Sequence, residues 1–444
     1  MISSHKIILV SLGCSKNLVD SENMLGLLKD RGFCIVSRME EAQIAVINTC
    51  GFIQSAVEEA IDTIMAFIDR KKRGRLEKIF VTGCFVQRYG YKLRKEMPEV
   101  DGWVGTGEIG RIGDILEAIP GRSAALLINR PKHLSDHRTP RVQTTPFYSA
   151  FLKIAEGCSH QCSYCTIPVL RGPFRSREKD SLIIEAEGMA ARGVREINLI
   201  AQDTTHYGGD LEDNIGLEDL LMELLEIEDI KWLRILYGHL HRISERLLKL
   251  MEREDKICPY LDIPLQHCNE DILKAMGRTS KRETPMELLE RVRSISRRLS
   301  LRTTLMVGFP GETDDIFQEL YDFVKTAAFD HLGTFVYSPE KGTPAARLKG
   351  SIDRKTAEER QEIIMGLQKD ITREKNIGMK GKIVPVLIEG PSPETDLLLR
   401  GRTAEMAPDV DSQVLINKGT GTVGEIVPVK ITEAHPYDLV GEII

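Results

Sequence analysis

Short strand-like runs alternate with helical stretches twice along this chain, over residues 6–118 and again over residues 147–378. When a helix follows each strand, the helix returns the chain to the end where the next strand begins, so neighbouring strands lie parallel. A chain of 444 residues also exceeds what one hydrophobic core usually organises. The alternation therefore predicts two α/β units, each built on a parallel sheet.

The second unit contains six strand-helix repeats, which fits a partial (β/α)6 barrel with its chemistry at the carboxyl ends of the strands. Its last helix, about 354–377, has no strand after it and leads out of the unit. The pattern then changes to four or five short β segments broken by glycine and proline, which is typical of a small OB-like β-barrel. The predicted fold class is thus α/β, with domains at 1–120, 147–378 and 379–444 and a linker at 121–146.

The overall composition is that of an ordinary soluble globular protein. Hydrophobic residues make up 42% and charged residues 28%, and no apolar run approaches the roughly 18 residues that cross a bilayer. A net charge of -6 gives no global case for binding nucleic acid or a membrane surface. Nine unevenly spaced cysteines in a long chain without a secretion signal indicate the reducing cytoplasm, where metal ligation is a better explanation than disulfides.

Three cysteines at positions 158, 162 and 165 form the most informative motif, Cys-x3-Cys-x2-Cys. Chance is a poor explanation for this spacing, but a zinc site completed by a distant residue and a set of buried structural thiols both remain open. A four-iron cluster held by three thiolates is the third interpretation, and it leaves one iron open for a ligand. The motif follows the first barrel strand, on the face where barrel enzymes assemble their active sites, and this placement favours the cluster.

A Cys-x3-Cys-x2-Cys motif after a first barrel strand resembles the signature of the radical S-adenosylmethionine enzymes. The resemblance implies that Cys158, Cys162 and Cys165 hold a 4Fe-4S cluster whose open iron binds S-adenosylmethionine. It also implies that an electron from this cluster cleaves the cofactor to a 5′-deoxyadenosyl radical.

Two further barrel segments are candidates for contacts with the cofactor or the substrate. Gly308 and Gly311 flank Pro310 just after a predicted strand, where backbone passes close to a ligand. A tight strand-to-helix turn explains these glycines equally well. Gln202 and Asp203 lie at another predicted strand end, where a helix cap is the alternative role.

Cys14, Cys50 and Cys84 each follow a predicted strand of the first unit by one or two residues. The carboxyl ends of parallel strands share one edge of a sheet, so these thiols can converge; three separate buried cysteines are the alternative. With the two units that follow, these cysteines resemble the methylthiotransferases over essentially the whole chain. That resemblance implies a TRAM-like C-terminal barrel and a second 4Fe-4S cluster on the three cysteines, which carries the sulfur to be inserted. No role follows for Cys34, Cys258 and Cys268.

The segment "LGCSKNLVDSE", residues 12–22, resembles the branch of this family that modifies a ribosomal protein, although Ser15 stands where that branch usually has proline. The segments "LIAQDTT" and "YLDIPLQH" resemble the same branch. Residues 379–444 hold six basic and ten acidic residues, whereas a domain that grips tRNA should be basic. The resemblance thus implies methylthiolation of an aspartate β-carbon in the S-twelve protein of the small ribosomal subunit, using two S-adenosylmethionine molecules.

The same resemblance implies an electron donor such as flavodoxin or ferredoxin. The composition predicts no membrane contact, and the negative charge of residues 379–444 predicts no direct tRNA binding. Glu405, Asp409 and Asp411 fall in one predicted loop and are expected to face the basic substrate protein, with an ordinary solvated surface as the alternative. Two rival functions stay open. One is methylthiolation of a tRNA adenosine, and the other is a non-enzymatic iron-sulfur or zinc protein that binds a ribosomal partner.

Overall fold

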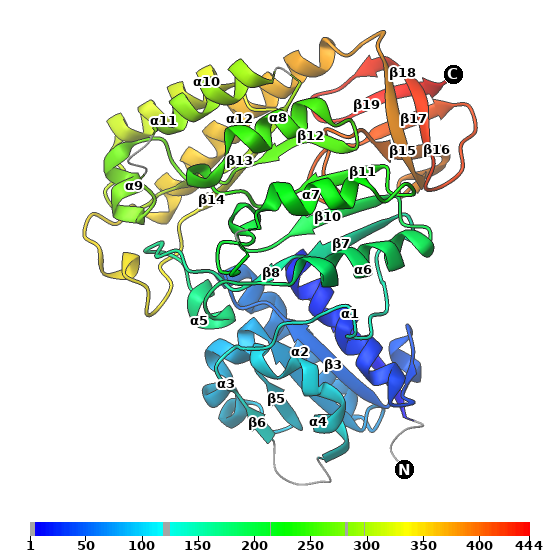
Figure 1. Ribbon diagram of the computed structural model, residues 1–444. Helices are drawn as coiled ribbons and strands as arrows, with labels where there is room; N and C mark the ends of the chain where they lie inside the picture. Colours follow the sequence, from blue (N-terminus) through cyan, green and yellow to red (C-terminus); the bar gives the residue numbers. More distant parts are fainter. Residues whose placement is uncertain (1–4, 119–124, 214, 280–282, 297) are drawn as a thin grey trace.

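The computed structural model describes residues 5–118, 125–213, 215–279, 283–296 and 298–444, and Figure 1 shows them as three successive units. Two units contain six-stranded sheets and the third is a closed β-barrel. The predicted α/β fold class is confirmed. Within the described residues, no helix is both long and apolar enough to cross a membrane.

The N-terminal unit is a parallel sheet with helices on both faces. Its strand order is β2-β1-β3-β4-β5-β6. Ala45 and Ile47 of the central strand pack against α2 and α3, whereas Ile44 and Val46 pack against α1 and α4, as the two-residue period of a strand requires. The elements are β1 (Lys6–Ser11), α1 (Ser15–Asp30), β2 (Cys34–Ile35), η1 (Met39–Glu41), β3 (Ile44–Thr49), α2 (Gln54–Lys72), β4 (Lys78–Gly83), α3 (Cys84–Glu96), β5 (Gly102–Val104), η2 (Thr106–Arg111), α4 (Ile112–Ala118) and β6 (Ala125–Leu127).

Strand β6 comes from the stretch predicted to be a linker. It pairs in parallel with β5, with Gly102 opposite Ala125. Residues 121–124 of the predicted linker lie outside the described part of the chain. The N-terminal sheet thus draws its edge strand from beyond residue 120.

The central unit is an open six-stranded parallel sheet with the order β7-β10-β11-β12-β13-β14, as the partial-barrel prediction requires. A short antiparallel ribbon, β8 with β9, follows the first strand. The elements are β7 (Ser149–Lys153), β8 (Ala155–Glu156), α5 (Ile167–Arg171), β9 (Arg175–Ser176), α6 (Lys179–Ala191), β10 (Glu196–Ile200), η3 (Thr204–His206), α7 (Leu217–Leu225), β11 (Trp232–Ile235), η4 (Leu240–Arg242), α8 (Glu245–Arg253), β12 (Ile257–Asp262), α9 (Glu270–Met276), α10 (Pro285–Ile295), β13 (Ser300–Val307), α11 (Asp314–Ala327), β14 (His331–Val336), η5 (Ala345–Arg347) and α12 (Arg354–Ile377).

The two faces of this sheet differ in chemistry. Leu152, Leu199 and Leu233 belong to the apolar core beneath the covering helices. The intervening strand residues include both apolar and charged side chains, and they contact the other two units. Lys153 forms an ion pair with Asp20 of α1, and Arg234 donates to the carbonyl oxygen of Ala404 at 2.7 Å. The inner face therefore receives both the N-terminal unit and the C-terminal barrel.

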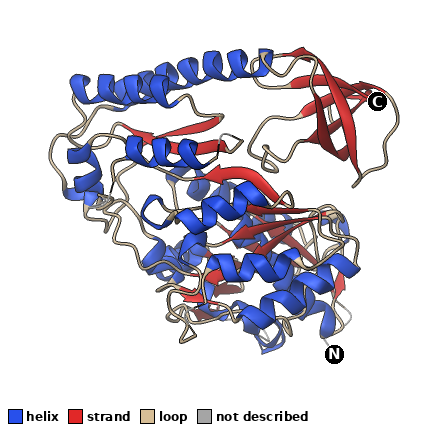
Figure 2. Ribbon diagram, turned by 45° about the horizontal axis from the view of Figure 1, so that its top comes forward, coloured by secondary structure: helices blue, strands red, loops and turns tan. Residues whose placement is uncertain are grey.

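The C-terminal unit is a closed five-stranded barrel with the order β15-β16-β17-β19-β18. Helix α12 leads into it along one side of the molecule (Figures 1 and 2). Arg402 anchors the barrel by donating to the buried Glu196 carboxylate at 2.8 Å. Its strands are β15 (Ile383–Ser392), β16 (Thr395–Arg402), β17 (Val414–Lys418), β18 (Ile426–Ala434) and β19 (Leu439–Ile443).

The prediction of an acidic docking loop was wrong for Asp411. Its side chain is 1% exposed and pairs with Arg302 of β13. It also accepts a hydrogen bond from the Tyr260 hydroxyl at 2.6 Å. Arg302 is mostly shielded from solvent, at 18% exposed, and the loop supplies its counter-charge by folding inward. Glu405 and Asp409 are exposed.

Candidate active site

The N-terminal cysteine triad lies at the carboxyl edge of the first sheet. Cys14 precedes α1, Cys50 follows β3, and Cys84 begins α3 directly after β4. Parallel pairing of β1, β3 and β4 brings these strand ends to one edge. Close approach also needs glycine: a Cβ on Gly13, whose φ is +90°, would lie 2.6 Å from the Cβ of Cys50.

The second triad lies in one loop after β8. The Cys158 amide donates to the carbonyl oxygen of Gly172 at 3.0 Å, and the Cys165 amide donates to that of Cys162 at 3.1 Å. Arg278, from the segment after α9, donates to the Cys162 sulfur at 3.6 Å. The loop is thus fixed by its own backbone and by one arginine from a neighbouring barrel element.

Most of these thiols are poor acids in the protein without metal. Burial is the main cause that raises the pKa of Cys84 and of Cys165 to about 12, and that of Cys158 to about 11. Burial also raises the pKa of Cys50. Thiolates are the metal-binding form, so metal binding must displace these protons.

The spacing of the sulfurs indicates what kind of metal centre fits. In the described residues, the only three ligand side chains with donor atoms within 4.8 Å of one another are His160, Asp203 and His239. Sulfurs on one tetrahedral zinc, at about 2.3 Å from the metal, lie roughly 3.8 Å apart. Neither cysteine triad is that compact. Donor sets of three thiols fit four-iron clusters with one open iron each.

A buried charge network joins the two triads. Arg171 donates through Nε to the Cys84 sulfur at 3.2 Å and through Nη2 to Asn17 at 3.0 Å. It also pairs with Asp20 of α1 and with Glu156, two residues before Cys158. Lys153 pairs with the same two carboxylates. The two carboxylates of this network are matched by two cationic side chains. This pairing compensates for the cost of removing all four charges from water.

Sequence reasoning missed this network, although a signal was present. Lys153 and Glu156 are charged residues in and beside the otherwise apolar strand run "AFLKIAEG". Coulomb attraction to Lys153 and then to Arg171 overcomes the effect of burial and lowers the pKa of Glu156 to about 2. Charged residues in a buried strand indicate a functional or interfacial role.

The two glycines that were predicted to contact the cofactor or the substrate lie in the turn between β13 and α11. Gly308 has a φ of +74°, its amide donates to Glu312 at 3.0 Å, and a Cβ there would lie 2.5 Å from the Cβ of Ala357. The amide of Gly311, with a φ of +94°, donates to Gly350 at 2.9 Å. Turn geometry and packing account for both glycines, and a cofactor contact stays a prediction.

The predicted pair at the end of β10 lies beside the barrel triad. Gln202 donates to Glu156 at 3.2 Å, while its buried amide oxygen has no hydrogen-bond partner in the described part of the chain. That orphaned acceptor suits a ligand donor such as an amino group. Asp203 contacts His160 at 2.6 Å, inside the cysteine loop.

Comparison with known proteins divides the chain as the fold does. Residues 6–105 match the Uncharacterized protein family UPF0004, residues 152–324 match the Radical SAM superfamily and residues 381–444 match the TRAM domain. A solved radical S-adenosylmethionine methyltransferase, TsrM from Kitasatospora setae, has the same fold over 77% of each chain, with a TM-score of 0.57 and 16% identity.

Full-length relatives are much closer. The ribosomal protein uS12 methylthiotransferase RimO of Pelobacter propionicus is 47% identical over 99% of this chain and 98% of its own. RimO of Geobacter sulfurreducens is 46% identical over 100% and 99%, and RimO of Myxococcus xanthus is 45% identical over 98% and 91%. The chain therefore belongs to the RimO family of ribosomal protein uS12 methylthiotransferases.

Proposed function

We propose that this protein attaches a methylthio group to the β-carbon of an aspartate in ribosomal protein uS12, using S-adenosylmethionine and two 4Fe-4S clusters. The observation that supports this proposal most strongly is the arrangement of the two cysteine triads. Each offers three thiols, and one buried arginine contacts Cys84 while pairing with Glu156, two residues before Cys158. Two incomplete donor sets in such proximity suit a reaction that needs two open irons.

The bound clusters and cofactor supply the radical and the sulfur, which no side chain provides. Cys158, Cys162 and Cys165 hold the cluster that binds S-adenosylmethionine, and Cys14, Cys50 and Cys84 hold the other. Arg278 and Arg171 each donate to one cysteine sulfur and fix its orientation. Gln202, Asp203, Gly308 and Gly311 are assigned to the surroundings of the cofactor or the substrate.

The domain division expected from the sequence also divides the work. Residues 1–120 carry the sulfur-donating centre, and residues 147–378 generate the radical. Residues 379–444 take part in docking and are joined to the rest by the inner face of the central six-stranded sheet. The net charge of residues 379–444, with six basic and ten acidic residues, supports a protein partner and gives no grip on tRNA phosphates. The proposed substrate places the activity in the cytoplasm, with a flavodoxin or a ferredoxin as electron donor.

The test compares uS12 and bulk tRNA by mass spectrometry from wild-type cells, from cells lacking the gene, and from cells complemented with the Cys158→Ala variant. The proposal expects a methylthio group on one uS12 aspartate in wild type alone, with methylthiolated tRNA adenosines unchanged. Loss of the tRNA modification with intact uS12 would instead support the rival substrate.

A further inference from the structure

The loop after β11, residues 237–242, reaches from one triad to the other, and we call it the β11 loop. At its start, the Tyr237 hydroxyl lies 3.4 Å from Ser15 Oγ, next to Cys14. Further on, the ring of His239 stacks on that of His160, with centroids 4.0 Å apart and planes at 9°. His160 lies between Cys158 and Cys162. A molecule bound at this loop is therefore within reach of both proposed clusters.

The backbone of the β11 loop is held in a costly conformation. Tyr237 has a φ of +62°, in the left-handed region that a tyrosine rarely adopts. Its amide donates to Asp262 at 2.9 Å, and Lys16 of α1 lies over its ring. Strain that the surroundings maintain is concentrated at binding and catalytic sites.

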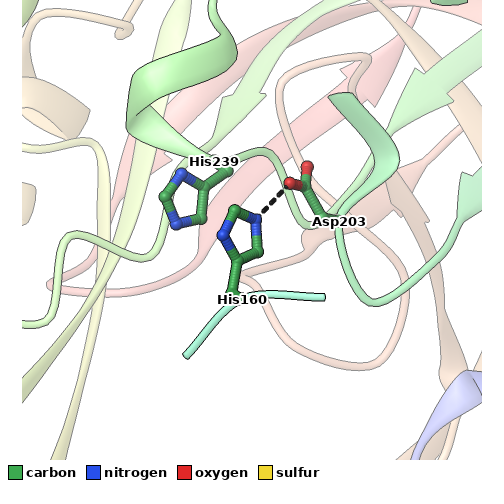
Figure 3. A group of neighbouring side chains, drawn as sticks. All are labelled: His160, Asp203 and His239. Atoms are coloured by element: carbon green, nitrogen blue, oxygen red, sulfur yellow. Dashed lines mark hydrogen bonds and ion pairs between the residues drawn. The ribbon is translucent and has the colours of Figure 1, made fainter. Parts of the chain in front are cut away.

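His160, Asp203 and His239 form a compact group at this loop (Figure 3). Asp203 is buried; it contacts His160 Nε2 at 2.6 Å and accepts from the Thr205 hydroxyl at 2.7 Å. Arg242, at the end of the loop, lies 3.4 Å from the same carboxylate. Histidine and aspartate are common metal ligands, so a cation is one candidate for the ligand of this group. The nearby Arg242 makes an anion the other candidate.

Charge decides between these candidates. Asp203 is the one carboxylate of the group, and it is already shared by His160 and Arg242. Burial and the nearby charge of Arg278 lower the pKa of His239, so this ring is neutral. A cation would have two arginines as neighbours, whereas an anion would be attracted by them.

Donors are also available for an anion. The His241 amide donates to Nδ1 of His239 at 3.4 Å, which leaves the Nε2 proton of His239 for a ligand. Within the described residues, the Arg242 side chain makes no hydrogen bond beyond its contact with Asp203, so its terminal amino groups are free. Arg242 is 39% exposed and can be reached by the loop of a macromolecule.

We infer that Arg242 and His239 bind a carboxylate next to His160, and that this carboxylate is the side chain of the uS12 aspartate that is modified. The inference rests on the proposed function and names the residues that hold its substrate. A second source of the same chemistry is the carboxylate of S-adenosylmethionine. Exposure favours the substrate, because Arg242 faces solvent while Arg278, beside Cys162, is only 7% exposed.

The test uses anaerobic holoenzyme and two synthetic uS12 peptides that differ only in aspartate or asparagine at the modified position. Fluorescence anisotropy measures peptide affinity, and equilibrium dialysis measures S-adenosylmethionine affinity. Wild type should bind the aspartate peptide roughly tenfold to a hundredfold more tightly, as expected for a charge-assisted hydrogen bond. Arg242→Gln should abolish this preference and Arg242→Lys should keep part of it, with cofactor affinity unchanged in both.

Arg246→Gln is the matched control, since Arg246 lies four residues further on, is 56% exposed and pairs with Asp219 instead. It should behave as wild type. A preference that survives Arg242→Gln overturns the inference, as does a variant that loses cofactor affinity alone. Tight zinc binding that depends on His239 would show a cation site and also overturn it. Failure of wild type to methylthiolate the aspartate peptide and intact uS12 would contradict the proposed function instead.

Discussion

Each of the two cysteine triads offers three thiols, yet the chain builds the two triads in different ways. The barrel triad occupies one loop, residues 158–165, and is held by backbone hydrogen bonds within that loop and to Gly172. The N-terminal triad is collected from three strand ends that only the parallel register brings together. One triad is therefore a local motif, while the other is assembled by the whole sheet. Its cysteines also depend on the barrel, because Arg171 from α5 contacts Cys84.

The largest effect should come from removing the barrel triad. Replacing Cys158, Cys162 and Cys165 together by alanine removes the donors proposed for the cluster that binds S-adenosylmethionine. We expect the reductive formation of 5′-deoxyadenosine, measured by chromatography, to fall to the background of protein-free controls. Cofactor cleavage at the wild-type rate by this variant would contradict the assignment of the loop.

Removing the N-terminal triad should separate the two roles. With Cys14, Cys50 and Cys84 changed to alanine, the barrel loop keeps all its own contacts, so 5′-deoxyadenosine should still form. Methylthiolated product, measured by mass spectrometry, should be absent. Product at the wild-type yield would exclude the N-terminal site from sulfur insertion.

Arg171 is the link between the triads, and its loss should affect one of them more. Arg171→Met leaves Asp20 and Glu156 with Lys153 as their one shared cation, which should lower the free energy of unfolding by about 3–5 kcal/mol in urea titrations. Loss of a positive charge beside Cys84 should also lower the reduction potential of the N-terminal cluster. A redox titration monitored by electron paramagnetic resonance measures this potential.

Arg278→Met is the comparison variant, because Arg278 contacts Cys162 of the other triad. It should shift the potential of the barrel cluster and leave the N-terminal one in place. Equal shifts of both clusters in both variants would mean that neither arginine acts locally.

A smaller effect concerns pH and the protein without metal. Burial raises the pKa of Cys84 and Cys165 from 9.0 to about 12 and that of Cys158 to about 11, so these thiols stay protonated in the folded state after they have ionised in the unfolded state. The folded state then binds more protons, and its stability falls as pH rises from about 9 towards 12. Denaturant titrations should show this decline, and it should be weaker in the barrel-triad variant. A decline that is unchanged in both triad variants would assign it to other groups.

The parts of the fold with local periodicity could be predicted from the sequence. Short β-rich runs such as "IAVINT", alternating with helical stretches along the chain, predicted the parallel sheets, and the helix expected at about 354–377 is α12. The barrel motif was visible because its ligands are close in sequence. Convergence of Cys14, Cys50 and Cys84 was predictable only through the rule that parallel strands share an edge.

Contacts between distant segments could not be predicted. Arg171 lies 151 residues from Asp20 and 87 from Cys84, so no spacing in the sequence relates them. The inward course of Asp411 depends on Arg302, 109 residues away. Strand β6 was read as linker because three residues are too few to show a period.

The most direct test of the two-centre account is the iron content and Mössbauer spectrum of anaerobically reconstituted protein, taken for wild type and for the two triple-alanine variants. Two clusters on two independent triads predict about eight irons per chain in wild type and about four in each variant, all as 4Fe-4S. Zinc in either site, or about four irons in wild type and none in one variant, would contradict the account.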